Sequence, residues 1–199
     1  MISLRGILKI IKLKIMPDTS KKTELPQCVQ TSVMPRLFSD KKILDACCGS
    51  RMFWFDKSNP NVLFADIRTE NHILCDGRKL DIEPDIEMDF RNMPFPDNSF
   101  KMVVFDPPHL KALGKESWMA KKYGVLLPTW ELDIKAGFDE CMRVLEPYGT
   151  LIFKWNENQI KVSEIINAIG QQPLFGHKSG KSANTHWLSF MKIVLDNEA

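Results

Sequence analysis

The residues Asp106–His109 combine an acid, two prolines and a ring directly after the apolar run 101–105. Proline has a fixed φ angle and no backbone N–H, so the pair forms a rigid rim with free carbonyl groups. The Asp106 carboxylate and the Pro107 carbonyl can both accept hydrogen bonds from one amino group, and His109 can cover a flat substrate. This combination suits chemistry on a planar amine, although paired prolines also commonly just terminate a strand.

Three further acids, Asp45, Asp66 and Asp89, each stand at the end of a short apolar run. In an open α/β sheet, ligands bind beyond the carboxyl ends of parallel strands, near the switch in strand order. We therefore expect these acids on the same edge as Asp106. Asp66 can accept both hydroxyl groups of a ribose there.

The segment after Asp45, residues 46–50, consists of small side chains that let a ligand approach the backbone closely. A helix is predicted to begin in 51–57, and its N-terminal amides would face a ligand carboxylate. The acidic stretch 76–89 is interpreted as a solvated connection.

Strands alternate with helices along the chain. The clearest helix covers 129–145, because its apolar residues recur every three or four positions, and Gly170 ends a second helix over 162–169. Strands are predicted over 43–47, 62–65, 86–88, 102–105, 150–155, 173–177 and 186–195. This alternation predicts a parallel sheet. The connection 178–185 is too short for a parallel crossover, so the last strand should be antiparallel.

This arrangement resembles the class I S-adenosylmethionine-dependent methyltransferases over about residues 40–195. Residues 45–50 resemble the family's first motif, which wraps the methionine part of the cofactor. Asp66 looks like the ribose-binding acid, and Asp89 like the residue near the adenine amino group, with 94–100 similar to the same region. Asp106–His109 is similar to the Asp/Asn-Pro-Pro-aromatic motif of amino-methyltransferases. Residues 47–54 also resemble small phage-associated methyltransferases.

The resemblance implies a Rossmann-like, doubly wound sheet of seven strands, mostly parallel with an antiparallel last strand. The implied cofactor is S-adenosyl-L-methionine, and the residues expected to bind it are Asp45, Ala46, Cys47, Cys48, Gly49, Asp66, Asp89 and Phe90. The expected catalytic residues are Asp106, Pro107, Pro108 and His109. The chain departs from the family at Arg51, where a second glycine is usual, and at His109, where tyrosine, phenylalanine or tryptophan is usual.

The expected activity is N-methylation of an exocyclic amine of a nucleobase, with adenine N6 in DNA or RNA as the leading target. The expected substrate contacts are Lys111, Trp118, Lys121, Lys122, Trp155 and His186. The lysine-rich segment can equally track a phosphate backbone or form a solvated loop, whereas for Trp155 a place in the core is favoured over a substrate contact. Two alternatives remain open: methylation of a protein side chain, and a catalytically inert module that binds the cofactor and serves a partner.

Composition limits the other classes of function. The 199 residues divide into a basic N-terminal segment and linker or lid, 1–39, and one methyltransferase domain, 40–199. A net charge of +2 does not by itself require a polyanion, and five irregularly spaced cysteines favour a reduced, cytoplasmic protein without a metal site. Neither a signal peptide nor a membrane span is expected. Because the catalytic fold uses nearly the whole chain, sequence-specific DNA binding would need the basic terminus, a homodimer or an accessory protein.

Overall fold

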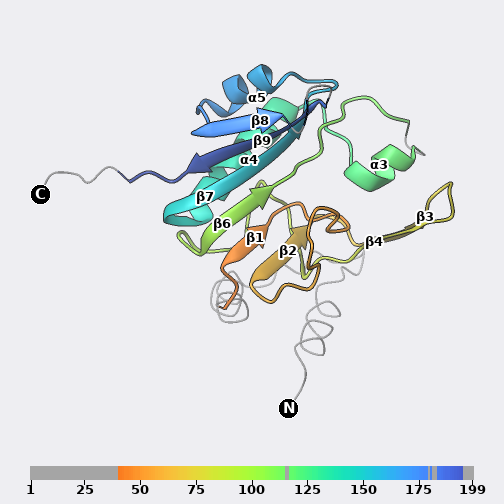
Figure 1. The fold of residues 1–199 in the computed structure, drawn as a ribbon, viewed down its shortest axis with the longest axis horizontal. Helices are drawn as coiled ribbons and strands as arrows, with labels where there is room; N and C mark the ends of the chain where they lie inside the picture. The colour runs from red at the N-terminus through yellow and green to blue at the C-terminus, as the bar shows by residue number, and fades with distance from the viewer. Residues whose placement is uncertain (1–39, 115–116, 179, 181–182, 195–199) are drawn as a thin grey trace, which may run out of the picture.

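A computed structural model describes residues 40–114, 117–178, 180 and 183–194, so the predicted N-terminal segment and linker or lid, 1–39, lie outside it. Seven strands form one sheet in the order β5-β2-β1-β6-β7-β9-β8 (Figure 1). They are β1 (Ile43–Asp45), β2 (Val62–Asp66), β5 (Ile86–Glu87), β6 (Phe100–Phe105), β7 (Leu145–Asn156), β8 (Phe175–Lys178) and β9 (Thr185–Met191).

The strand directions confirm the predicted fold class. β1 pairs in parallel with β2 and with β6, β5 pairs in parallel with β2, and β7 pairs in parallel with β6. β9 enters between β7 and β8 and is antiparallel to both. The short connection between β8 and β9 leaves no room for a crossover, which is why the last strand reverses direction.

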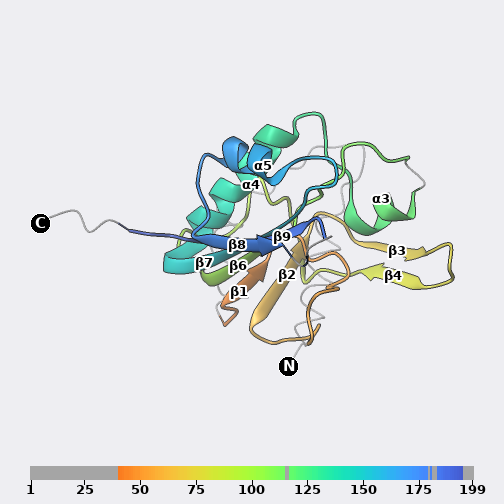
Figure 2. The same ribbon diagram turned by 45° about the horizontal axis from the view of Figure 1, so that its top comes forward.

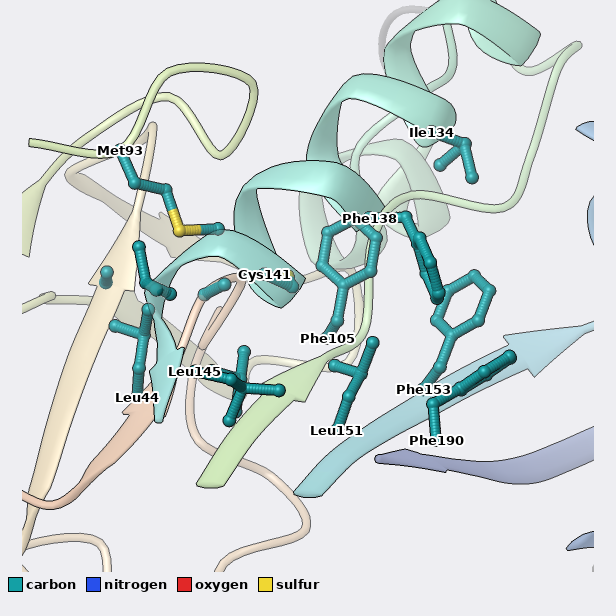
Figure 3. Packing of buried hydrophobic residues seen from close by; sticks show 14 of the residues in the cluster. Leu44, Met93, Phe105, Ile134, Phe138, Cys141, Leu145, Leu151, Phe153 and Phe190 are labelled. Carbon is teal, nitrogen blue, oxygen red and sulfur yellow. The ribbon is translucent and has the colours of Figure 1, made fainter. Parts of the chain in front are cut away.

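Two helices, α4 (Trp130–Val144) and α5 (Val162–Ile169), cover the same face of the sheet (Figure 2). On this face, Phe138 of α4 packs against side chains of β6, β7 and β9, including Phe105, Phe153 and Phe190 (Figure 3). Gly137 lets α4 approach the sheet closely, because a Cβ atom there would lie 2.5 Å from Phe90 and 2.8 Å from Phe105. The helix therefore fixes the position of Phe90, which lines the functional site.

The prediction of a helix over 51–57 is wrong, because Arg51 organises this segment as a loop. Arg51 adopts a φ angle of 55°, and its guanidinium lies 3.9 Å from the centre of the Phe64 ring. It donates hydrogen bonds to the carbonyls of Lys57 and Glu83, at 2.6 and 2.8 Å, and to Asp85 at 3.1 Å. The hydrogen bonds of the Arg51 side chain thus hold this segment, in place of the backbone hydrogen bonds of a helix.

A hairpin replaces the solvated connection predicted over 76–89. Its strands, β3 (Glu70–Ile73) and β4 (Lys79–Ile82), project from the main sheet (Figures 1 and 2). Leu74, Leu80 and Ile82 form a small cluster of their own. A short helix, α3 (Trp118–Tyr123), lies within the lysine-rich segment and is capped by the Ser117 side chain. In the described part of the chain, no helix has both the length and the apolar character needed to cross a membrane.

Candidate active site

The candidate site lies where the strand order switches. From β1 the chain passes to β2 and β5 on one side, whereas β6 leads to β7 on the other side. The first residue after β1 remains tied to β6, because the Ala46 N–H donates to the Val104 carbonyl at 2.9 Å. The segments that follow β1, β2 and β6 therefore meet at one edge of the sheet, as the strand-end acids predicted.

Two adjoining cavities open at this edge. The first has a volume of about 80 Å³ and is lined by the loop after β1, the end of β2, Phe90, the residues 106–109 and the end of α3. The second has a volume of about 330 Å³ and extends along the end of β7 toward β9. The residues that line both are Met52, Phe53, Asp106, His109 and Tyr123. The first cavity alone is smaller than a typical ligand site, so it encloses only part of a ligand.

Small residues after β1 form the floor of the first cavity, as predicted for Ala46, Cys47, Cys48 and Gly49. The Cys48 N–H donates to the Ala65 carbonyl at 2.8 Å, which ties this loop to β2. Gly49 adopts a φ angle of 48°, and a Cβ atom there would meet nothing within 4 Å. Burial raises the pKa of the Cys47 and Cys48 thiols, so both stay protonated and act as small packing groups.

Asp66 ends β2 and lines the first cavity, where it was predicted. Its Oδ2 accepts the Gly49 N–H at 2.9 Å, while its Oδ1 accepts the Arg68 N–H at 3.0 Å and Arg68 Nε at 3.3 Å. A carboxylate has about four acceptor positions, so roughly one remains for a ligand hydroxyl. Asp66 therefore both shapes the loop and offers an acceptor to the cavity.

The prediction that Asp45 binds the cofactor is corrected by the structure, because Asp45 lines neither cavity. Its side chain is fully buried, with Trp54 Nε1 donating to Oδ2 at 2.7 Å and the Cys47 N–H donating to Oδ1 at 3.3 Å. Burial raises its pKa to about 7, although these hydrogen bonds oppose the change. Asp45 thus positions the loop after β1 and does not itself contact a ligand in the cavity.

The raised pKa of Asp45 predicts a pH-dependent stability. In the unfolded chain this carboxyl titrates near its model value of 3.8, whereas in the folded protein it titrates near 7. The unfolded state releases the proton first, so the contribution of Asp45 to stability is lost as the pH rises from about 4 to 7. Asp45→Asn, which cannot titrate, should gain roughly 2–4 kcal/mol in unfolding free energy relative to the wild type between pH 4 and pH 8.

Urea unfolding at a series of pH values measures this difference. Asp81→Asn, which removes an exposed carboxyl on β4, is the matched control and should follow the wild-type pH profile. If the Asp45→Asn curve also runs parallel to the wild-type curve, Asp45 is not the buried acid described above.

Asp106 lies at the boundary between the two cavities and forms an ion pair with Lys154 of β7. The Lys154 Nζ atom is 2.5 Å from Asp106 Oδ2, and the side chains are only 18% and 16% exposed. Burial raises the pKa of Asp106, although the Lys154 cation opposes this effect. Pro107 and Pro108, which are expected to be catalytic, line the first cavity beside Asp106.

His109 lines both cavities with an uncharged imidazole ring. It is packed at a tilt against Tyr123, with 5.6 Å between ring centres, and lies edge-on to Trp155 at 6.2 Å. Burial, together with the nearby Lys154 cation, lowers the pKa of His109 to about 4, against a smaller opposing effect of a hydrogen bond with the Pro107 backbone. The ring is therefore uncharged at neutral pH and can lie against a flat, neutral ligand.

Asp89, predicted to contact the cofactor, turns away from both cavities. Arg91 binds both of its oxygens through Nε at 3.0 Å, and Arg91 Nη1 also reaches Asp133 at 2.9 Å. These hydrogen bonds lower the pKa of Asp89. The neighbouring Phe90 does line the first cavity, where its ring packs against Phe105 with 5.2 Å between ring centres.

The substrate contacts predicted in the lysine-rich segment do not all lie at the cavities. Lys122 lines the first cavity, with its ammonium 5.1 Å from the centre of the Tyr123 ring. Lys111 lies outside both cavities and places its ammonium 4.5 Å from the centre of the Trp130 ring. Lys121 and Trp118 belong to α3 and line neither cavity, although Trp118 is exposed nearby.

The structure also corrects the prediction that Trp155 and His186 contact the substrate directly. Trp155 is fully buried, and its Nε1 donates to the Ile160 carbonyl at 3.0 Å. His186 is also buried and places Nε2 3.1 Å from Glu157 Oε1. The pKa of Glu157 is lowered to about 2 by Lys178 and His186 together. Glu157 thus links the end of β7 to β8 and β9 through Lys178 and His186, and neither Trp155 nor His186 lines a cavity.

Several lining residues were not among the predicted contacts: Phe53, Ile67, Arg68, Met119, Lys154 and Asn158. Of these, Lys154 alone had a visible signal in the sequence, because it interrupts the apolar strand Leu151–Trp155. The aromatic and methionine side chains gave no such signal, since apolar residues near strands most often belong to the core.

The residues of the first cavity fit S-adenosylmethionine, the cofactor that the fold family implies. The open cradle at Gly49 can accept the chain of a ligand, the Asp66 carboxylate can accept a hydroxyl hydrogen, and Lys122 can pair with a carboxylate. The ring of Phe90 and the side chain of Ile67 offer apolar contacts to a flat base. Among the residues that the structure describes, no group of histidine, cysteine and acidic side chains could hold a metal ion.

Known proteins match this chain in structure, but no match was found in sequence. Neither protein-family models nor curated protein sequences give a match. The chain is similar to a SAM-dependent methyltransferase from Methanosarcina mazei, with 11% identity over 86% of this chain and 100% of that chain and a TM-score of 0.46. It is similar to a putative methylase from Haemophilus influenzae, with 12% identity over 84% and 98% and a TM-score of 0.43.

A protein from Pyrococcus horikoshii is similar at 15% identity over 79% of this chain and 85% of that chain, with a TM-score of 0.45. A cyclase is also among the matching structures. One fold can support several chemistries, so the residues of the site, and not the fold, indicate the function.

Proposed function

We propose that this protein is an S-adenosylmethionine-dependent N-methyltransferase that acts on the exocyclic amine of a nucleobase, with adenine N6 as the expected acceptor. The observation that carries the proposal is the position of Asp106, whose side chain lines both cavities. A group bound in the second cavity would meet, at this carboxylate, a ligand bound in the first. Proximity and alignment of this kind supply a large share of the rate in a group transfer.

S-adenosylmethionine, when bound, supplies an electrophilic methyl group attached to a sulfonium. The protein then has to hold the amine in line and accept its proton. An exocyclic amine is a poor nucleophile because its lone pair is delocalised into the ring. Hydrogen bonds from the amine to the Asp106 carboxylate and the Pro107 carbonyl would draw this lone pair out of conjugation. The raised pKa of Asp106 makes its carboxylate a better acceptor for the departing proton.

The second cavity suits a flat, uncharged target. Neutral His109, Tyr123 and Phe53 line it with rings, and its volume of about 330 Å³ falls within the range of small-molecule sites. A base inside a duplex would have to be flipped out to enter, whereas a single strand avoids that cost. Exposed Trp118 on α3 offers a stacking surface for a neighbouring base.

The test is to incubate the protein with S-adenosylmethionine carrying a labelled methyl group, together with single-stranded DNA, duplex DNA or RNA. The nucleic acid is then digested and its nucleosides are separated. We expect the label in N6-methyladenine. Label in N4-methylcytosine would keep the reaction but change the base, while label confined to protein would support side-chain methylation. If the cofactor binds but no substrate is labelled, the catalytically inert module that binds the cofactor and serves a partner is the better description.

A further inference from the structure

A lysine stands beside the carboxylate that is proposed to hold the target amine. Phe105 of β6 pairs with Phe153 of β7, so Asp106 and Lys154 follow at equivalent positions on neighbouring strands. The flanking residues Phe153 and Trp155 are fully buried in the core. Side chains alternate along a strand, so Lys154 points to the other face, where it lines the second cavity.

The ammonium group of Lys154 is held from several sides. It lies 2.5 Å from Asp106 Oδ2, 5.3 Å from the centre of the Phe53 ring and 5.8 Å from the centre of the Trp187 ring. An ammonium has three N–H donors. Among the described residues, Asp106 is its one hydrogen-bond acceptor. Two donors therefore remain for a ligand in the second cavity.

Together the two side chains present an acceptor next to a donor. Asp106 Oδ1 accepts no hydrogen bond from the described residues, while the adjacent Lys154 Nζ has N–H groups to donate. An asparagine side chain offers the same pair of functions when it binds the N6 amine and a ring nitrogen of adenine. The Asp106–Lys154 pair is thus complementary to an amine whose neighbouring atom is a hydrogen-bond acceptor.

We propose that Lys154 is a specificity-determining residue of the second cavity, and that it donates a hydrogen bond to the ring nitrogen beside the reacting amine. This inference rests on the proposed function and narrows its substrate class. The preferred targets are neutral amines that have an acceptor ring nitrogen on one side. In adenine that nitrogen is N1, which is bonded to the same carbon as the amine, or N7, which lies on the other side of the amine in the five-membered ring.

The test uses three short single-stranded DNAs that differ at one adenine, which is left intact or replaced by 1-deazaadenine or 7-deazaadenine. For the wild type we expect kcat/KM to fall about 10–100-fold with one of the two analogues and to change little with the other. Lys154→Met should transfer methyl groups to adenine and to that analogue at equal, low rates. Lys154→Arg, which keeps the donor, should restore part of the preference.

Two controls separate this effect from a loss of structure. Lys79→Met makes the same change of charge on the projecting β4 and should keep the wild-type preference. Chemical unfolding shows whether Lys154→Met remains folded. If Lys154→Met does not fold, the rates of the wild type with the three DNAs still test the proposal, because that measurement requires no variant.

Binding gives a readout that is independent of turnover. Calorimetry measures the affinity of the three DNAs for the wild type with S-adenosylhomocysteine present, and the same 10–100-fold preference is expected. A preference in binding without any methylation would overturn the proposed function but support the role of Lys154. Methylation of all three DNAs at equal rates would overturn the role of Lys154 and leave the function standing. If neither these DNAs nor RNAs that carry the same three bases bind, both proposals fail.

Discussion

The Asp106→Ala variant is expected to transfer methyl groups at least about 10³-fold more slowly than the wild type. The substitution removes the carboxylate that lines both cavities and would accept a hydrogen of the target amine. It also leaves the Lys154 ammonium, only 18% exposed, without its counter-ion beside the reacting nitrogen. An unpaired cation there would repel the positive charge that develops on the amine.

The measurement is the initial rate of transfer of a labelled methyl group to single-stranded DNA at saturating cofactor. Asp106→Asn keeps one acceptor oxygen and should fall between the wild type and Asp106→Ala. Asp139→Ala removes an exposed acid of α4 that pairs with Lys135, and it should leave the rate unchanged. A rate for Asp106→Ala within tenfold of the wild-type rate would contradict the assigned role.

The Asp66→Ala variant is expected to bind S-adenosylmethionine about 100-fold more weakly. One reason is the lost acceptor for a ligand hydroxyl in the first cavity. The other reason is that the Asp66 carboxylate holds the loop after β1, because it accepts hydrogen bonds from the Gly49 N–H and from Arg68. Without it, the cradle at Gly49 would have to be ordered when the ligand binds, at a cost in conformational entropy.

Calorimetric titration with S-adenosylmethionine measures this loss. Asp66→Asn retains one oxygen acceptor and should lose less affinity than Asp66→Ala. Asp76→Ala removes an exposed acid between β3 and β4 that pairs with Arg78, so it changes the net charge equally without touching the first cavity. Affinity of Asp66→Ala equal to that of Asp76→Ala would show that Asp66 does not serve the cofactor.

The structure also explains how an arginine can stand where the first motif of the methyltransferases that the sequence resembles has a second glycine. Arg51 adopts a positive φ angle that a glycine would adopt easily, and its guanidinium compensates by donating hydrogen bonds to Lys57 in the same loop and to Glu83 after β4. This loop carries Met52 and Phe53 into the wall shared by the two cavities. The departure at Arg51 therefore shapes the boundary of the site.

His109 stands where the amino-methyltransferase motif that residues 106–109 resemble has a larger aromatic residue, and a second ring lies beside it. Tyr123, from α3, packs beside the histidine and lines the same two cavities. A second ring from a distant segment can thus supply part of the flat surface that the motif's own aromatic residue would provide. The sequence placed Tyr123 near the motif but could not show that the two rings are in contact.

The strands of the main sheet and the edge at which the site lies could be predicted from the order of residues along the chain. Strand positions follow from short apolar runs, and helix α4 follows from a periodic apolar stripe, because both patterns depend on neighbours along the chain. The antiparallel β9 follows from the length of one connection. The acids at strand ends could be placed on one edge for the same reason, since parallel strands end on the same side.

Which of those side chains face the cavities depends on three-dimensional packing and could not be predicted. Asp45, Asp66 and Asp89 occupy similar places in the sequence, yet Trp54 holds Asp45 in the interior and Arg91 holds Asp89 on the surface. Asp106 and Lys154 are 48 residues apart and meet because β6 and β7 pair in register. Such contacts depend on side-chain partners from distant segments, and no local pattern along the chain encodes them.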